Sequence, residues 1–139
     1  MEIEQIVLLN DIWQPIGAAP KLASHNQETP LHLGFSCYVF NDSGEVLMTR
    51  RALEKKVWPG IWINSCCGHP APDEPMNAAV ERRLQYELGL KINNLQLALP
   101  KFRYHCEFYR ILENECCPVF VARTHSQPKL NPTEVMDNV

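Results

Sequence analysis

Residues 67–90 contain several residue types that bind metal ions or phosphate groups. Glu87 offers the carboxylate oxygen that magnesium prefers, usually alongside phosphate oxygens of a substrate. Arg83, four residues earlier, would repel a metal ion, but its guanidinium can grip a diphosphate through two hydrogen bonds. Cys67 and His69 place a thiol and an imidazole at the start of the stretch. These four side chains are the candidates for chemistry in this stretch.

Two clusters of charged residues lie outside this stretch. Four basic residues follow one another closely, and alone they would be read as a solvated loop: Arg50, Arg51, Lys55 and Lys56. Glu113 and Glu115 are separated by one residue, so on a strand both side chains point to the same face. Same-face carboxylates repel, and a shared metal ion or proton would explain them. The alternative is an exposed strand edge with two solvated glutamates.

An amphipathic helix is expected to position Arg83 and Glu87. Apolar residues recur every four positions and form one stripe: Met76, Val80, Leu84 and Leu88. Pro75 suits a first helical turn, and Asp73 or Glu74 can cap the free amides. Gly89 is placed to end the helix in a left-handed conformation. For a lone helix, a solvated Arg83–Glu87 pair on the surface would be the simpler interpretation.

Strands are expected on both sides of this helix. Gln5–Leu9 and Phe35–Phe40 are apolar runs, and the turn residues at 41–44 predict that residues 46–49 return as a hairpin partner. Further strands are predicted at residues 63–66, 95–104 and 116–123, and residues 134–139 could start another. A mixed sheet with a central helix indicates the α/β class.

Length and composition narrow the class of protein. The 139 residues suffice for one domain that buries roughly two-thirds of its unfolded surface. The net charge of −3 implies no general attraction to nucleic acid or to an anionic membrane. No apolar run approaches the ~20 residues of a membrane span, and the N-terminus lacks a signal-peptide pattern. The six cysteines include two adjacent pairs, a poor layout for disulfides, so we expect reduced thiols and a cytoplasmic protein.

Residues 68–90 resemble the Nudix box, G-x5-E-x7-R-E-U-x-E-E-x-G-U, in which U is aliphatic. Seven positions fall in register: Gly68, Glu74, Arg82, Leu84, Glu87, Gly89 and Leu90. Arg83 and Tyr86 depart from the box, because each stands where it has a glutamate. Nudix hydrolases use those glutamates to hold magnesium ions for phosphate cleavage. The departures leave Glu87 as the main carboxylate and predict that the hydrolytic cluster is lost.

The resemblance extends to one family with a Nudix-like fold, the type I isopentenyl-diphosphate isomerases. It covers the chain from about residue 5 onward and is carried by the segments LHLGFSCYVFN, RRALEKKVWPGIWINSCCGHP and ENECCPVF together with the altered box. The family interconverts isopentenyl and dimethylallyl diphosphate by protonating the C3–C4 alkene and removing a proton from C2. The resemblance implies that Cys67 and Glu115 work on opposite faces of the carbon skeleton, and that Tyr104 positions the glutamate.

The resemblance also implies the metal and substrate ligands. One divalent ion, manganese, magnesium or zinc, would be held by a mixed nitrogen and oxygen set: His25, His32, His69, Glu113 and Glu115. Glu87 would bind a second magnesium that enters with the diphosphate. The diphosphate itself would be bound by four basic residues: Lys21, Arg51, Lys55 and Arg83. The partner is thus a small prenyl diphosphate, and we expect a monomer or a weak homo-oligomer.

Members of this family usually continue beyond this length. The resemblance therefore implies a single domain at residues 1–139 without the family's C-terminal helical part, and without a tryptophan that faces the developing carbocation. Trp13, Trp58 and Trp62 do not match that position, so we expect metal binding with poor turnover. Two alternatives remain open: a Nudix pyrophosphohydrolase, and an inactive fragment that binds metal or diphosphate.

Overall fold

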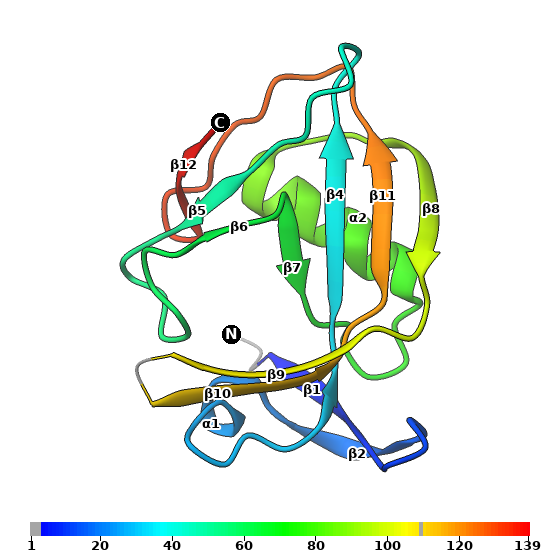
Figure 1. The fold of residues 1–139 in the computed structure, drawn as a ribbon, viewed down its shortest axis with the longest axis vertical. Helices are drawn as coiled ribbons and strands as arrows, with labels where there is room; N and C mark the ends of the chain where they lie inside the picture. Colours follow the sequence, from blue (N-terminus) through cyan, green and yellow to red (C-terminus); the bar gives the residue numbers. More distant parts are fainter. Residues whose placement is uncertain (1–3, 109) are drawn as a thin grey trace.

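The computed structural model describes residues 4–108 and 110–139, which form three β-sheets and two helices (Figure 1). Parallel pairing occurs between β11 and β4 and between β10 and β3, and the other strand pairs are antiparallel. The sheets are therefore mixed, and the predicted α/β class is confirmed. No helix in the described ranges is long and apolar enough to cross a membrane.

A four-stranded sheet stands at the centre of the molecule. Its strands, in spatial order, are β7 (Cys66–Gly68), β4 (Phe35–Phe40), β11 (Val119–Arg123) and β8 (Asn93–Leu99). Alternate residues of β4 are buried, and Phe35, Cys37 and Val39 form the hydrophobic core with Phe120 and Ala122 of β11. This alternation is what a strand with one buried face requires.

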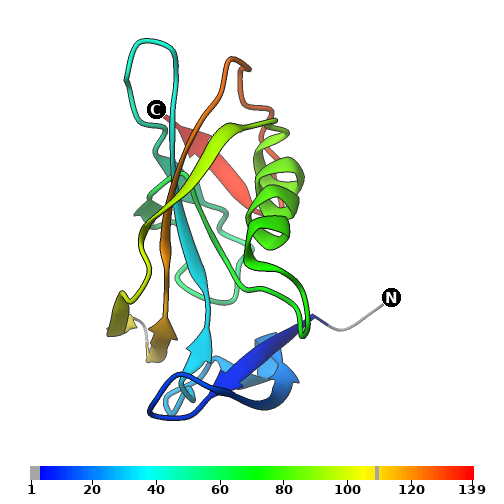
Figure 2. The same ribbon diagram turned by 90° about the vertical axis from the view of Figure 1, so that its right-hand side faces the viewer.

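Helix α2 (Met76–Leu88) covers one face of that sheet (Figures 1 and 2). The predicted stripe is buried at Val80, Leu84 and Leu88, and Gly89 ends the helix at φ 61°. The expected cap is wrong, because no side chain caps the N-terminus and Pro75 is the N-cap residue itself. Glu74 binds elsewhere: its carboxylate accepts hydrogen bonds from the Ala71 amide and from Arg82.

A five-stranded sheet lies across one end of the four-stranded sheet (Figure 1). Its order is β2 (Pro15–Pro20), β1 (Gln5–Leu9), β3 (His32–Leu33), β10 (Ile111–Cys116) and β9 (Arg103–Phe108). The single-turn helix α1 (Lys21–Ser24) follows β2 directly and leads toward β3. The predicted strand at residues 5–9 is confirmed with the same bounds.

The described chain passes between the five-stranded and four-stranded sheets three times, and two of these passages lie side by side. Gly34 separates β3 from β4, and Cys117 and Pro118 separate β10 from β11. Backbone hydrogen bonds continue across this junction, because the Gly34 amide donates to the Cys116 carbonyl at 2.9 Å and the Ser36 amide to the Pro118 carbonyl at 3.0 Å. The junction holds β3, β10 and β7 close together, and the candidate site lies there.

The third sheet differs most from expectation. It contains β12 (Val135–Asn138), β5 (Thr49–Arg51) and β6 (Trp62–Ile63). The predicted hairpin of residues 46–49 with β4 is wrong beyond its first residues. In the part of the chain that the structure describes, Val46 and Leu47 bond to β4, and the chain then leaves to pair with β12. The strand at residues 134–139 is confirmed as β12 and supplies the partner.

Two predicted long strands are each divided in the structure. Residues 95–104 contain the end of β8 and the start of β9, separated by a turn at Pro100 and Lys101. Residues 116–123 contain the last residue of β10 and all of β11, separated by Cys117 and Pro118. Residues 63–66 likewise divide between β6 and β7 at a bend formed by Asn64 and Ser65. Proline explains the first two breaks, because it donates no ladder hydrogen bond.

Candidate active site

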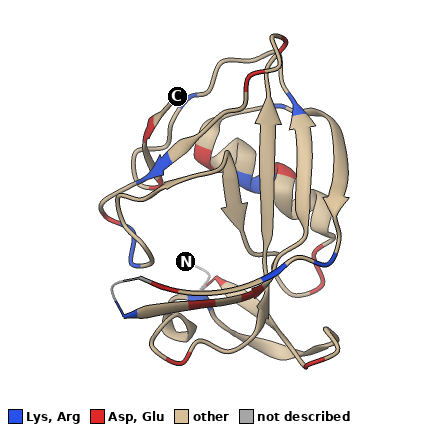
Figure 3. Ribbon diagram, in the orientation of Figure 1, with Lys and Arg blue, Asp and Glu red and all other residues tan. Residues whose placement is uncertain are grey.

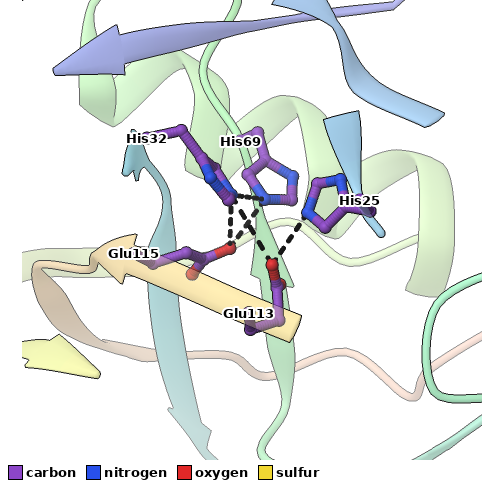
Figure 4. A group of neighbouring side chains, drawn as sticks. All are labelled: His25, His32, His69, Glu113 and Glu115. Carbon is purple, nitrogen blue, oxygen red and sulfur yellow. Dashed lines mark hydrogen bonds and ion pairs between the residues drawn. The ribbon is translucent and has the colours of Figure 1, made fainter. Parts of the chain in front are cut away.

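Five side chains from four parts of the chain converge at the junction of the sheets (Figure 4). Three are imidazoles and two are carboxylates, and their ligand atoms all lie within 4.8 Å of one another: His25, His32, His69, Glu113 and Glu115. His25 ends α1, His32 begins β3, and His69 follows β7. Both glutamates project from one face of β10. The structure therefore brings together all five residues expected to hold the first metal ion.

Backbone carbonyls fix the tautomers of two of the histidines. The Nδ1–H of His25 donates to the Lys21 carbonyl at 2.7 Å, and the Nδ1–H of His32 donates to the Pro30 carbonyl at 2.8 Å. Each ring then presents an unprotonated Nε2 to the cluster. This is how outer hydrogen bonds orient metal-ligating histidines.

The converging atoms have more lone pairs than donors. The Nε2 atoms of His32 and His69 are 3.2 Å apart, and both lie near Oε2 of Glu115, at 3.3 and 2.7 Å. Nε2 of His25 lies 2.8 Å from Oε1 of Glu113, yet neither buried atom has a hydrogen-bond partner among the described residues. A divalent cation would satisfy these acceptors, and mixed imidazole and carboxylate ligands suit manganese, magnesium or zinc. The residues present thus fit a bound metal ion.

The two carboxylates differ in their ionisation. Burial raises the pKa of Glu113, and the nearby Glu115 raises it further against the lowering effect of His25. Burial also disfavours the Glu115 carboxylate, but contacts with His69 and His32 outweigh it and hold the pKa of Glu115 well below its ordinary range. Glu115 is therefore the ionised member of the pair, and Glu113 takes up a proton more readily.

The pKa values of His69 and His32 also shift in opposite directions. Burial lowers the pKa of His69 to about 4, so its ring is neutral at physiological pH and its lone pair is available to a metal ion. Burial acts in the same direction on His32, but hydrogen bonding and charge from Glu115 outweigh it and raise the pKa of His32. A metal ion would therefore compete with a proton chiefly at His32.

The two adjacent cysteines face opposite sides of β7. Cys67 lines a pocket beside the cluster, whereas Cys66 is buried in the core with its Sγ 3.3 Å from Oε2 of Glu87. Consecutive side chains of a strand point to opposite faces, and the two cysteines follow this rule. Burial raises the pKa of Cys67 to about 11, and negative charge on Glu115 acts in the same direction. Cys67 is thus a thiol, rather than a thiolate, at neutral pH.

Tyr104 lies directly opposite Glu115 in the β9–β10 ladder. Opposite residues of an antiparallel pair share a face, so the phenol is on the same side of the sheet as the carboxylate. Burial raises the pKa of Tyr104, and the charges of Glu115 and Glu113 raise it further, so the phenol keeps its proton. The ring packs near Trp58, with 6.5 Å between ring centroids.

The pocket beside the cluster has about 700 Å³ of empty space when the solvent at its open mouth is included. All four basic residues expected to bind a diphosphate line it: Lys21, Arg51, Lys55 and Arg83. Figure 3 shows basic segments on β5, on the loop after it and on α2, with acidic segments on β10. The pocket therefore has a basic side and, at the cluster, an acidic side.

Acidic residues hold three of these basic side chains in place. Glu4 lies 3.1 Å from Lys21, and Glu134 contacts both Lys55 and Arg83. Glu134 is 3.5 Å from the Arg83 guanidinium. Neither acid was expected from the sequence, because no short motif connects residues so far apart in the chain.

Glu87 is not among the pocket-lining residues or in the five-residue cluster. Its Oε2 accepts a hydrogen bond from Nε of Arg83 at 3.0 Å, and both side chains are buried, 7% and 5% exposed. A solvated surface pair is therefore the wrong interpretation of Arg83 and Glu87. The guanidinium is surrounded by three carboxylates, from Glu4, Glu87 and Glu134.

Gly34 is a site residue that the sequence alone did not indicate. A Cβ atom at this position would lie 2.5 Å from Oε1 of Glu115, which is too close for any real contact. The absence of a side chain at the junction therefore makes room for the ionised carboxylate. A lone glycine between β3 and β4 gives no signal of this in the sequence.

Comparisons of the sequence with known proteins identify close relatives. The NUDIX domain family matches residues 30–139. The chain is 54% identical over 134 residues to an isopentenyl-diphosphate Delta-isomerase of Saccharopolyspora erythraea, which covers 96% of this chain and 69% of that protein. It is 55% identical over 135 residues to a protein of the same name from Paenarthrobacter aurescens, and the match covers 96% of this chain and 73% of that protein. A Salmonella paratyphi B protein of that name is 49% identical over 138 residues, covering 99% and 76%.

Solved structures show the same fold at low sequence identity. A crystal structure of a Deinococcus radiodurans protein superposes with a TM-score of 0.74 at 16% identity and covers 98% of this chain and 82% of that chain. The MutT protein of Methanosarcina mazei superposes with a TM-score of 0.63 at 20% identity, covering 79% and 75%. At these identities the likeness concerns the fold alone.

Proposed function

The chain belongs to the isopentenyl-diphosphate Delta-isomerases, a family with the NUDIX fold, and from that premise we propose that it interconverts isopentenyl and dimethylallyl diphosphate in the Cys67 pocket, within one domain spanning residues 1–139. The reaction moves a double bond: one proton is added at C4 and another is removed from C2. It needs a proton donor and a proton acceptor held on either side of a five-carbon chain. The convergence of Cys67, Glu115 and Tyr104 on one pocket supports this function.

The first metal ion would be held by the five converging residues. Their orphaned acceptor atoms and fixed tautomers support this assignment, and the donor set admits manganese, magnesium or zinc. When bound, the ion would supply positive charge that keeps the Glu115 carboxylate ionised and fixed in position. Holding the ion is the role of His25, His32, His69 and the two glutamates.

Cys67 and Glu115 carry the two proton transfers in this proposal. The thiol is protonated at neutral pH because its pKa is raised to about 11, and the carboxylate is ionised because its pKa is lowered. The resting site therefore contains one group that can give a proton and one that can accept it, as an isomerisation without net proton change requires. Tyr104, a neutral phenol opposite Glu115 in the β9–β10 ladder, would position the carboxylate.

Four basic residues would bind the diphosphate. Lys21, Arg51, Lys55 and Arg83 all line the pocket. Charge-assisted hydrogen bonds from such groups are the strongest available for a phosphate. The family resemblance also gives Glu87 a second magnesium that accompanies the diphosphate, and binding it would require the Glu87 carboxylate to leave its contact with Arg83, 3.0 Å away.

The proposal is tested by incubating the metal-reconstituted protein with isopentenyl diphosphate and following both possible products by NMR. We expect dimethylallyl diphosphate to form without release of phosphate or pyrophosphate. Cys67→Ala is expected to abolish the conversion and Cys66→Ala to retain it, because only Cys67 faces the pocket. Release of phosphate without isomerisation would instead support a hydrolase, and binding without either product would support a non-catalytic domain.

A further inference from the structure

Asn64 lies at the bend between β6 and β7, three residues before Cys67. The backbone of this bend is held without help from the Asn64 side chain. The Thr49 hydroxyl donates to the Asn64 carbonyl at 2.8 Å, and the Ser65 hydroxyl joins the Val39 amide to the Leu47 carbonyl. The fold of the bend therefore does not explain why an amide side chain stands at this position.

The side chain of Asn64 has one hydrogen bond among the described residues, and its partner is the Cys67 thiol. Sγ of Cys67 donates to Oδ1 of Asn64 at 3.1 Å. Asn64 is 9% exposed, so water has little access to this contact. A buried polar side chain whose single described contact is a pocket-facing thiol acts on that thiol.

A second polar group contacts the thiol from β4. Oγ of Ser36 lies 3.5 Å from Sγ of Cys67 and 3.3 Å from Sγ of Cys117. Ser36 pairs with Cys67 across the β4–β7 ladder, so their backbones fix this approach. Cysteine on a strand can adopt more than one χ1 rotamer, and two polar contacts, one from the bend and one from β4, select one of them.

We propose that Asn64 is a positioning residue that holds the Cys67 sulfur toward the substrate carbons through the contact of its Oδ1 with Sγ. This inference rests on the proposed isomerase function and adds a residue to it. Asn64 does not line the pocket with the reacting groups and acts through Cys67 alone. Displacing a reacting atom by about 1 Å can lower the rate of a catalysed step on the order of a hundredfold.

Two variants of similar shape separate the hydrogen bond from packing. Asn64→Leu keeps the volume and removes the acceptor, and we expect kcat to fall by about tenfold to a hundredfold. KM should stay within a factor of about two, because the basic residues that would bind the diphosphate are untouched. Asn64→Asp keeps an acceptor oxygen in the same place and should retain most of kcat.

Ser65→Ala is the matched control on the same bend. It removes the hydroxyl that joins Val39 to Leu47 and should lower the melting temperature, but it leaves the contact between Asn64 and Cys67 intact. If kcat falls in Ser65→Ala as much as in Asn64→Leu at a matched loss of melting temperature, general loosening of the bend explains the effect and the proposal is wrong.

The deciding experiment measures kcat and KM of the metal-reconstituted wild type, Cys67→Ala, Asn64→Leu, Asn64→Asp and Ser65→Ala under one condition. A low kcat in Asn64→Leu with an unchanged KM, and recovery in Asn64→Asp, supports a positioning role. Wild-type kcat in Asn64→Leu, with Cys67→Ala inactive, overturns this inference and leaves the isomerase function standing. An inactive wild type, in contrast, contradicts the proposed function itself.

Discussion

At the scale of single residues, Gly34 leaves the space that the Glu115 carboxylate occupies. A methyl group there would come within 2.5 Å of Oε1, so Gly34→Ala must push the carboxylate away from the histidines. Displacing a ligand in this way typically weakens metal affinity by about tenfold to a hundredfold. We predict a loss of that size in a chelator-competition titration, with circular dichroism to confirm folding.

Gly17→Ala is the control for this prediction. A Cβ atom at Gly17 would meet nothing within 4 Å, and this glycine lies on β2, outside the cluster. Its metal affinity should equal that of the wild type. Equal losses in both variants, or none in Gly34→Ala, would contradict the role assigned to the space at Gly34.

The second residue-scale prediction concerns the protonation of Cys67. Because burial raises its pKa to about 11, the reactive thiolate fraction should grow about tenfold per pH unit throughout neutral and mildly alkaline pH. The alkylation rate with iodoacetamide, measured between about pH 7 and pH 10 in a Cys106→Ser background, should rise without a plateau. Cys106 is removed because it is exposed. A plateau above about pH 9 would indicate an ordinary thiol.

At the scale of secondary structure, α2 carries two neighbouring arginines with different environments. Arg83 is 5% exposed among three carboxylates, whereas the Arg82 side chain is 41% exposed beside Glu74. Removing one partner of a buried ion pair costs about 3–5 kcal/mol, since the other charges stay buried. An exposed pair contributes at most about 1 kcal/mol.

We therefore predict that Arg83→Ala lowers the free energy of unfolding by about 3 kcal/mol or more, and Arg82→Ala by about 1 kcal/mol or less. Urea unfolding of the two variants measures the difference directly. Arg83→Ala should also weaken diphosphate binding, because Arg83 lines the pocket. Comparable unfolding free energies for the two variants would show that Arg83 is not needed to stabilise the three carboxylates around it.

The elements differ in how far their sequence determines them. The four-residue spacing from Met76 to Leu88 and the glycine at position 89 predicted α2 correctly, because both signals are local. The apolar run Phe35–Phe40, rich in aromatic and β-branched residues, likewise predicted β4. The hairpin at residues 46–49 was predicted wrongly because β12, far along the chain, competes for the backbone of β5. A local sequence pattern gives no information about competition from a strand so far along the chain.

The same distinction applies to the site. The spacing of Glu113 and Glu115 was enough to place both on one face of a strand, but proximity to the three histidines came from the family resemblance. The burial of Arg83 depends on Glu4 and Glu134, at opposite ends of the chain. Asn64 and Gly34 act through contacts at distances of a few ångströms, which only coordinates reveal.

At the scale of the whole molecule, the five-residue cluster ties α1, β3, β7 and β10 together, so metal binding should depend on pH. Ligation needs neutral imidazoles. The pKa of His32 is raised above its ordinary value near 6.5, so protons compete for it as pH falls through neutrality. His69, with a pKa of about 4, stays neutral much longer.

We therefore predict that divalent-metal affinity weakens as pH falls below about 7, measured by titration with a fluorescent chelator. His32→Asn should reduce the affinity and flatten this pH dependence, because it removes the group at which protons compete. An affinity unchanged between about pH 7.5 and pH 5.5 would contradict histidine ligation. Retention of the same steep pH dependence in His32→Asn would contradict the assignment of the competing proton to His32.

The central claim is that Cys67 and Glu115 move protons to and from one substrate in this pocket. The most direct test incubates the metal-reconstituted protein with isopentenyl diphosphate in D2O and follows the products by NMR. We predict dimethylallyl diphosphate with deuterium in the methyl group formed from C4, and no deuterated product from Cys67→Ala or Glu115→Gln. Wild-type levels of deuterated product from either variant would contradict the account, as would cleavage of the diphosphate without isomerisation.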